Sequence, residues 1–310
     1  MRPCSISLPH LTNVVSTALL LSAPLLAGAA PPATFFDAVE QYGADDVAGC
    51  TRTLDTLYRS GGTFPAGGEL LLIECAAASG DRAAALAYID TLLPTGRLPL
   101  DDLRTKARPG LDALRADPAW PAVLQRIAAE EHTRTAQRDA PLRDALLQRE
   151  AKDQAAQHAA VAAGGGAAAW AQARSVSVEN ATWLKTVVAE KGWPGTSRVG
   201  SDGAKAAWVI VQHADHDPAF QAAMLPLIET AAKRGEGDLA DYALLTDRVL
   251  LAQGKPQRYG SQFKENADGV FELRPTVDMD GLDARRREVG LQPLAAYKAV
   301  LAEMYGKQVR

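Results

Sequence analysis

Histidine and aspartate side chains gather directly after a strongly apolar run at residues 206–211. The residues that follow the run are Gln212, His213, Ala214, Asp215, His216 and Asp217. Their spacings of three and four would place His213, His216 and Asp217 on one face if the helix continued. Imidazoles and carboxylates exchange protons or bind metals. Pro218 breaks the run, no other histidine is near in sequence and zinc-type spacings are absent, so we expect no metal.

A second apolar run, residues 242–251, carries Asp247 and Arg248 in its middle. The two side chains point to different faces of a helix, so they do not simply pair with each other. Burying an unpaired charge costs several kcal/mol or more, and at least one of them therefore needs a partner elsewhere. A buried aspartate beside a histidine orients the imidazole as a general base. This predicts His213 as a catalytic base and Asp247 as the residue that orients it.

Polar side chains on the loop after this run are suited to hydrogen-bonding a polar substrate. The candidate substrate-binding residues are Asn180, Trp193, Asp217, Arg248, Gln257, Tyr259 and Gln262. The alternative is a structural network of Asp247, His213 and Gln262 that only fixes the fold, because both arrangements satisfy buried polar groups. His213 also suits the C-terminal end of a buried helix, where its donors meet the negative end of the helix dipole.

The common enzyme signatures are absent. The sequence has no nucleophile elbow, phosphate loop, dinucleotide fingerprint or HExxH-type zinc motif. It therefore predicts no cofactor and gives no support to the commoner enzyme classes.

The elements that carry these residues are expected to be mainly helical, because alanine is abundant and aromatic residues are sparse. The helices expected in the C-terminal half cover residues 180–191, 203–211, 217–234, 238–253, 283–289 and 293–305. The segment 203–211 is apolar on nearly every face, which indicates a buried helix, with a buried strand as the alternative. Strands at 259–263 and 270–274 flank Asp268-Gly269, a strong hairpin signal.

The N-terminal half is expected to form helices at residues 34–58, 70–78 and 82–93. The segment from Cys75 to Leu86, with its Gly80-Asp81 turn, resembles a tetratricopeptide-type helix pair, and residues 111–120 are similar to the segment that closes such arrays. The resemblance covers about one and a half repeats, which is fewer than such arrays need to be stable. It implies either a peptide-binding groove or plain structural packing. A polar helix at 130–158 and an Ala/Gly-rich flexible loop at 161–169 follow.

The first 29 residues have the pattern of a signal peptide. Arg2 precedes an apolar core at residues 14–26, and Ala27-Gly28-Ala29 supplies small residues for cleavage. The alternative, a membrane anchor, needs a run of about 20 residues without a proline. We expect export to the periplasm or the medium and no stable membrane span after cleavage. The net charge of -4 and the lack of a basic stripe argue against nucleic acid as a partner.

Two cysteines remain after the signal, Cys50 and Cys75, because Cys4 precedes the apolar core. An even count in an exported chain predicts one disulfide between two neighbouring helices. The alternative is a pair of buried free thiols.

The segment from about residue 141 to 305 resembles an uncharacterised bacterial family, the domain of unknown function numbered 6624. The features that carry the resemblance are Asp153-Gln154, Glu179-Asn180, Gly192-Trp193-Pro194, Val199-Gly200, Ala207-Trp208, Gln212-His213-Ala214-Asp215, Asp217, Phe220-Gln221, Tyr242, Asp247-Arg248, Gln257, Tyr259-Gly260, Gln262, Asp283 and Arg285-Arg286. Two positions depart from the pattern: Gln157 replaces an arginine, and Ser261 replaces a threonine. The resemblance implies a domain boundary and a list of residues, but no activity.

The chain is therefore expected to comprise a signal peptide at 1–29, a tetratricopeptide-like helical domain at 30–130, a helical connector with its loop at 131–176, and a C-terminal domain at 177–310. The first hypothesis is an exported protein whose C-terminal domain performs acid/base hydrolysis or transfer on a small polar ligand. The alternative is a non-enzymatic envelope binding or scaffold protein that recognises a protein partner through its N-terminal helices.

Overall fold

The computed structural model describes residues 33–62, 64–65 and 67–310. The fold is mainly α-helical with one small antiparallel hairpin, as the composition predicts. Within the described residues, no helix is both long enough and apolar enough to span a membrane. The expected signal peptide at 1–29 lies outside the described residues.

The N-terminal helices are shorter and more numerous than the sequence pattern predicts. They are α1 (Phe35–Gly43), α2 (Val47–Arg59), α3 (Glu69–Ala78), α4 (Arg82–Leu92), the 3-10 turn η1 (Leu93–Thr95), α5 (Leu100–Thr105) and α6 (Pro109–Arg115). The single helix expected at 34–58 is wrong, because Asp45 has a φ of 64° and Asp46 starts a new helix. The carboxylate of Asp46 accepts the N–H of Gly49 at 2.8 Å, which is a normal N-cap. The helices expected at 70–78 and 82–93 are confirmed within two residues.

A buried carboxylate joins three of these helices. Glu74 of α3 is fully buried and accepts the backbone N–H groups of Gly110 and Leu111, at 3.0 and 2.9 Å, at the start of α6. The hydroxyl of Tyr42, at the end of α1, donates to the same carboxylate at 2.9 Å. Negative charge at a helix N-terminus is favourable, so Glu74 fixes α6 against α3.

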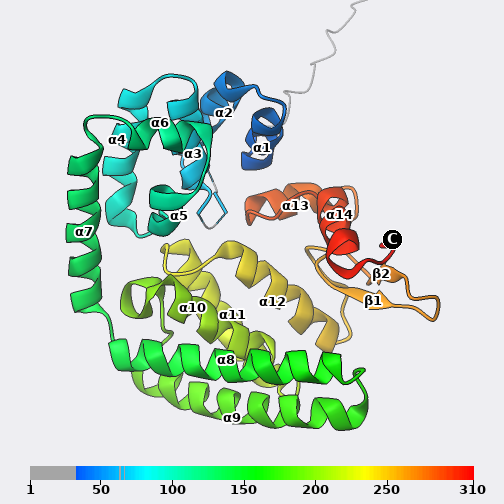
Figure 1. The fold of residues 1–310 in the computed structure, drawn as a ribbon. Coiled ribbons are helices and arrows are strands. Elements are labelled where there is room, and N and C mark those ends of the chain that lie inside the picture. Colours follow the sequence, from blue (N-terminus) through cyan, green and yellow to red (C-terminus); the bar gives the residue numbers. More distant parts are fainter. Residues whose placement is uncertain (1–32, 63, 66) are drawn as a thin grey trace, which may run out of the picture. The chain divides into compact units, whose positions relative to one another are not determined.

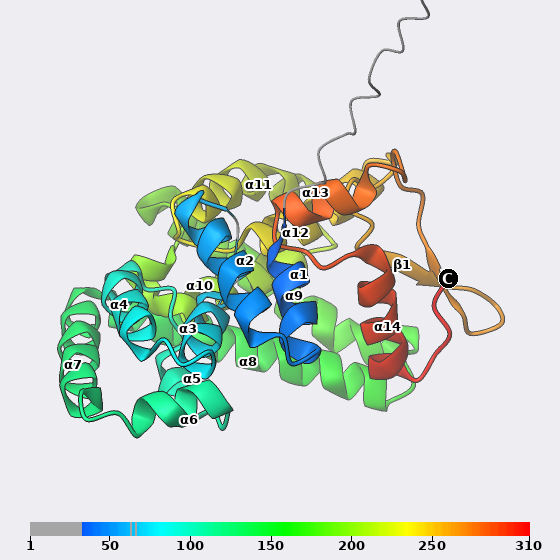
Figure 2. The same ribbon diagram turned by 90° about the horizontal axis from the view of Figure 1, so that it is seen from above.

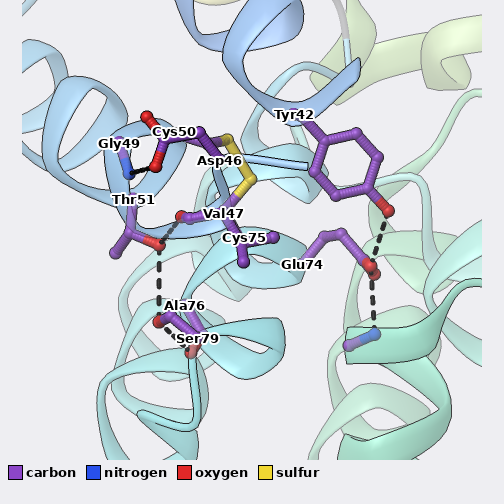
Figure 3. Close-up of a disulfide and its surroundings, with 11 residues drawn as sticks. Tyr42, Asp46, Val47, Gly49, Cys50, Thr51, Glu74, Cys75, Ala76 and Ser79 are labelled. Carbon is purple, nitrogen blue, oxygen red and sulfur yellow. Dashed lines mark hydrogen bonds between the residues drawn. A yellow bond between two sulfur atoms is a disulfide. The ribbon is translucent and has the colours of Figure 1, made fainter. Parts of the chain in front are cut away.

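The predicted disulfide is present between Cys50 of α2 and Cys75 of α3 (Figure 3). Its sulfur atoms are 2.07 Å apart, and both cysteines are fully buried. The bridge lies within a cluster that includes Leu54, Phe64 and Leu72. It therefore links α2 to α3, the helix that carries Glu74 and, at its start, Glu69.

Removing this disulfide is expected to lower the free energy of unfolding by about 3 kcal/mol, because it closes a loop of 25 residues in the unfolded chain. Denaturant unfolding of the wild type and of a Cys50→Ala/Cys75→Ala variant, each with and without dithiothreitol, measures the difference. Reductant should destabilise the wild type and leave the variant unchanged. Equal stability of the oxidised and reduced wild type would contradict the prediction.

Three long helices connect the two halves of the sequence. They are α7 (Trp120–Gln137), α8 (Ala140–Ala162) and α9 (Ala167–Lys191). The helix expected at 130–158 is wrong, because the chain leaves helical geometry at Arg138 and the carboxylate of Asp139 caps α8. The loop expected at 161–169 is a short turn at 163–166, in which Gly164 and Gly165 have positive φ. Helix α9 runs through residue 177 without interruption.

Helix α10 (Thr196–Gln212) is the buried centre of the C-terminal half (Figures 1 and 2). The expectation of a buried helix rather than a strand at 203–211 is confirmed. Gly200 has φ 77° and ψ 163°, which separates the first turn from the rest of the helix. The large side chains around α10 include Leu146 of α8, Leu184 of α9 and Leu245 of α12.

The remaining helices begin within one residue of the positions that the sequence predicts. Helix α11 (Pro218–Lys233) is capped by Asp217, and α12 (Leu239–Ala252) by Asp238. The hairpin pairs β1 (Phe263–Glu265) with β2 (Phe271–Leu273) around Asn266 to Gly269. Its strands are shorter than expected. The last helices are α13 (Leu282–Glu288) and α14 (Leu294–Tyr305), and the end of the chain pairs with β2 through the N–H of Phe271 and the carbonyl of Gln308 at 2.9 Å.

Candidate functional site

Asp247 lies fully buried on α12, and its partners are backbone groups of the following loop. Its Oδ1 accepts the N–H groups of Arg258 and Tyr259 at 2.7 and 2.8 Å, and its Oδ2 accepts the N–H of Ser261 at 2.9 Å. The expected pairing of Asp247 with His213 is therefore wrong. Asp247 instead binds backbone N–H groups of the segment 257–262, which we call the clamped loop.

The clamped loop is held from two further sides. The guanidinium of Arg286, on α13, is buried and donates to the carbonyls of Tyr259 and Gln292 at 2.5 and 2.7 Å. Burial lowers the pKa of Arg286, and the nearby charge of Asp247 opposes that shift. Gly260 has a φ of 63°, a conformation that favours glycine.

Gln257 and Tyr259 are parts of this scaffold. The amide nitrogen of Gln257 donates to the carbonyls of Gln262 and Arg274 at 3.1 and 3.0 Å, and its amide oxygen accepts the N–H of Gln262 at 2.9 Å. Gln257 is fully buried and Tyr259 is nearly so. Gln257 thus joins the clamped loop to the end of the hairpin, and its side-chain atoms are all used within the protein.

His213, directly after α10, contacts an aspartate from α8. Its Nδ1 hydrogen-bonds to Oδ2 of Asp153, whose side chain is 1% exposed, while the imidazole is 21% exposed. The other oxygen of Asp153, Oδ1, is buried and has no hydrogen-bond partner in the part of the chain that the structure describes. The sequence pattern missed this pair because 60 residues separate its members. The only signal was that Asp153 belongs to the residues that carry the family resemblance.

The histidine-rich segment does not converge on one point. Helix α10 ends at Gln212, so His213, His216 and Asp217 do not lie on one continuing helix. The hydroxyl of Ser177 donates to the carbonyl of His213 at 2.7 Å and lies 3.4 Å from Nδ1 of His216. Burial lowers the pKa of His216 and favours its neutral form. Asp217 caps α11 and accepts the ammonium of Lys185 at 2.5 Å.

A small polar pocket of about 240 Å³ lies between the start of α11, the end of α12 and the clamped loop. Its lining residues are Asp215, Gln221, Arg248, Leu251, Ala252, Gln262 and Arg274. Two of the predicted binding residues, Arg248 and Gln262, are among them. We call this cavity the arginine pocket. Asp215, Gln221 and Arg274 were not predicted as binding residues, because they come together only through the tertiary fold.

The polar groups of the arginine pocket form a connected set. Nη1 of Arg248 donates to both oxygens of Asp215 at 2.6 Å, while its Nε is buried and has no hydrogen-bond partner within residues 33–62, 64–65 and 67–310. The amide nitrogen of Gln221 donates to Asp215 at 3.2 Å and to the carbonyl of Gln212 at 3.0 Å. The exposed guanidinium of Arg274 has no partner within the described part of the chain. The pocket therefore presents two cationic side chains and one carboxylate.

The other two predicted binding residues lie elsewhere. Asn180 is buried, and its amide exchanges hydrogen bonds with the side chain and the carbonyl of Arg149, at 3.1 and 3.3 Å, which ties α9 to α8. Trp193 lines a separate and larger cavity of about 910 Å³. The nine predicted catalytic and binding residues thus do not form a single site.

Residues 140–310 match a family model that is described as a family of unknown function (DUF6624). The chain belongs to this family. The DUF6624 match contains α8 to α14 and both members of the Asp153–His213 pair, whereas the disulfide lies outside it. Comparison of the chain with curated proteins and with solved structures finds no match.

Among the residues that the structure describes, no group of three or more histidine, cysteine, aspartate or glutamate side chains is arranged to hold a metal ion.

Replacing Asp247 by asparagine is expected to destabilise the DUF6624 region by about 3 kcal/mol. An amide can offer only one acceptor oxygen, so its NH₂ group would face a backbone N–H that then loses its partner. The thermal midpoint should fall by roughly 2–4 °C for each kcal/mol lost. Asp215→Asn is the matched control, because its side chain is 63% exposed and exposed ion pairs contribute little. Similar midpoints for the two variants would show that the Asp247 bonds do not stabilise the loop.

Proposed function

We propose that this protein is exported and that its DUF6624 region binds a small anionic ligand in the arginine pocket, next to an acid/base pair formed by His213 and Asp153. The reaction class that fits these groups is hydrolysis or transfer on the bound ligand. The observation that carries the proposal is the Arg248 guanidinium, which is placed in a polar pocket with a buried, unpartnered Nε. Export is supported by the pattern of residues 1–29 and by the disulfide, which is typical of oxidising compartments.

The charge of the pocket favours an anion. Arg248 and Arg274 outnumber the single carboxylate of Asp215 among the lining residues. Guanidinium groups match the planar oxygen pairs of carboxylates and the oxygens of phosphates. Gln262 adds an amide whose nitrogen donates to the hydroxyl of Ser261 at 3.1 Å. The volume of about 240 Å³ is below that of drug-sized sites and suits a ligand of few atoms.

The Asp153–His213 pair supports the acid/base part of the proposal. A carboxylate on Nδ1 fixes the ring and its tautomer, and Nε2 is then the nitrogen that exchanges a proton with a ligand. His213 lies two residues before Asp215, which lines the pocket. The side chain of Gln221, another lining residue, donates to the carbonyl of Gln212, the residue directly before His213. His213 of the pair and Asp215 of the pocket therefore lie on the same turn between α10 and α11. Asp153 takes the orienting role that the sequence had predicted for Asp247.

Ligand binding is tested by a thermal-shift screen of phosphate, phosphate monoesters and small carboxylates on the purified protein. A ligand of the arginine pocket should raise the thermal midpoint of the wild type, and Arg248→Gln should weaken its binding by about tenfold or more, since one charge-assisted hydrogen-bonding group is lost. Arg104→Gln, which breaks an ion pair on α5, is the matched control and should leave binding unchanged. The binding proposal is wrong if no anion stabilises the wild type more than it stabilises Arg248→Gln.

The acid/base role is tested separately, by mass-spectrometric detection of turnover of the compounds that bind. His213→Gln should keep the thermal shift, because the pocket is intact, and should lose turnover by about 10²–10⁴-fold, the usual contribution of a general acid or base. Asp153→Asn should reduce turnover as well. Turnover by His213→Gln at the wild-type rate would refute the acid/base role. Binding without any turnover would favour the alternative of a non-enzymatic envelope binding protein.

A further inference from the structure

The larger cavity, of about 910 Å³, combines residues from distant parts of the sequence. One wall comes from α2, α3 and the segment around η1, and includes Tyr58, Glu69 and Arg97. The other wall comes from Trp193, α10, α11 and α12, and includes Lys205, Trp208 and Asp241. We call it the acidic cavity. It is distinct from the arginine pocket, with which it shares no lining residue.

Glu69 brings a buried carboxylate to the first wall. The residue is 3% exposed. Its Oε1 pairs with Nε of Arg97, whose Nη2 donates to the carbonyl of Phe64 at 3.0 Å. Its Oε2 is buried and has no hydrogen-bond partner among the described residues. Burial raises the pKa of Glu69, and the nearby charge of Arg97 opposes that shift.

Asp241 brings a second buried carboxylate to the opposite wall. It is 8% exposed and accepts the ammonium of Lys205 at 2.5 Å. Burial raises the pKa of this carboxyl as well. Asp238, at the start of α12, adds a like charge that raises the pKa of both Glu69 and Asp241. The two walls thus bring the carboxylates of Glu69, Asp238 and Asp241 to one cavity.

The full set of charged lining residues leaves this region short of positive charge. The carboxylates are Glu69, Glu236, Asp238 and Asp241, and the cations are Arg97, Lys205 and Lys233. Lys233 is engaged with Glu229 at 2.6 Å, a residue that does not line the cavity. The four carboxylates therefore outnumber the three cations, and two of the cations, Arg97 and Lys205, are already paired with Glu69 and Asp241.

The aromatic side chains of the cavity also favour a cation. Tyr58, Trp193 and Trp208 lie in its walls, and the ammonium of Lys205 is already placed 4.0 Å from the centre of the Trp208 ring. Aromatic faces attract ammonium groups, and the attraction is stronger when the cation is desolvated. The cavity volume lies within the range of sites for small organic molecules.

We propose that the acidic cavity binds a small organic amine in its protonated form, with its ammonium group donating to Oε2 of Glu69 and its carbon chain lying against the tryptophans. The ligand would satisfy the unpartnered oxygen and offset the excess negative charge. This site is separate from the anion-binding function proposed for the arginine pocket, and each can fail without the other.

The test is isothermal titration of the full chain with cadaverine hydrochloride, with pentanol as the neutral analogue and pentanoate as the anionic one. Cadaverine should bind and the two analogues should not. Glu69→Gln should weaken cadaverine binding by about tenfold or more, because a charge-assisted hydrogen bond is lost. Asp90→Asn, an exposed carboxylate paired with Arg126 at 2.7 Å, is the matched control and should bind cadaverine like the wild type.

Asp241→Asn is the second variant, in case Glu69→Gln does not fold as judged by circular dichroism, and it should also weaken cadaverine binding. The proposal is overturned if the wild type does not bind cadaverine. It is equally overturned if pentanol binds as tightly, or if the folded pocket variants bind cadaverine as tightly as Asp90→Asn does. None of these measurements depends on the arginine pocket, so its ligand screen stands or falls by itself.

Discussion

The carboxylate of Asp247 accepts three backbone N–H groups from one short loop, and the arrangement of the C-terminal half depends on these bonds. The buried guanidinium of Arg286 bonds carbonyl groups of the same loop. Either charge would be costly to bury without partners. Here the N–H groups of the loop bond the carboxylate, and its carbonyl groups bond the guanidinium. The loop then fixes Gln262 and, through Gln257, the strand end that carries Arg274. The arginine pocket is therefore a product of a buried ionic scaffold rather than of the apolar core alone.

The two cavities differ in charge and in their relation to the family. The arginine pocket is built wholly from residues within the DUF6624 match, and its cations outnumber its carboxylates. The acidic cavity needs Glu69 and Arg97, which precede the match, together with Lys205 and Asp241, which lie inside it. A chain that consisted of the DUF6624 region alone would retain the first cavity and lack one wall of the second.

Features that depend on neighbouring residues were predictable from the sequence. The starts of α11 and α12 and the position of the hairpin turn were predicted correctly, because each depends on residues next to it in sequence. These residues are Asp217 before Pro218, Asp238 before α12, and Asp268-Gly269 in the turn. The breaks at Asp45 and Arg138 were missed, because neither residue is a glycine or a proline and helical periodicity continues on both sides. The disulfide was predictable because only two cysteines follow the first 29 residues.

The partners of buried polar groups were not predictable in the same way. The sequence indicated that the buried carboxylate of Asp247 needs hydrogen-bond partners. The apolar helix around it does not reveal whether those partners are a histidine or three backbone N–H groups. His213 had the same ambiguity, and Asp153 lies in a polar helix where a buried carboxylate has no local signature. Arg274 and Gln221 are ordinary polar residues until the hairpin and α11 bring them to Arg248. Such pairings follow from tertiary packing and leave little trace in residue spacing.

Helix α14 has no buried residue, although it follows the part of the chain that holds the clamped loop. Its bond to that loop is from the hydroxyl of Tyr297 to the carbonyl of Ser261 at 3.4 Å, whereas the N–H of Ser261 points to Asp247 at 2.9 Å. Opening of α14 removes the contacts of the Tyr297 and Tyr305 rings with Phe263 and Phe271, but it leaves the Asp247 bonds in place. We therefore expect amide protons in α14 to exchange with solvent sooner than those of Tyr259 and Ser261, whose N–H groups bond Asp247. Local opening of α14 therefore does not break the Asp247 bonds that hold the wall of the arginine pocket.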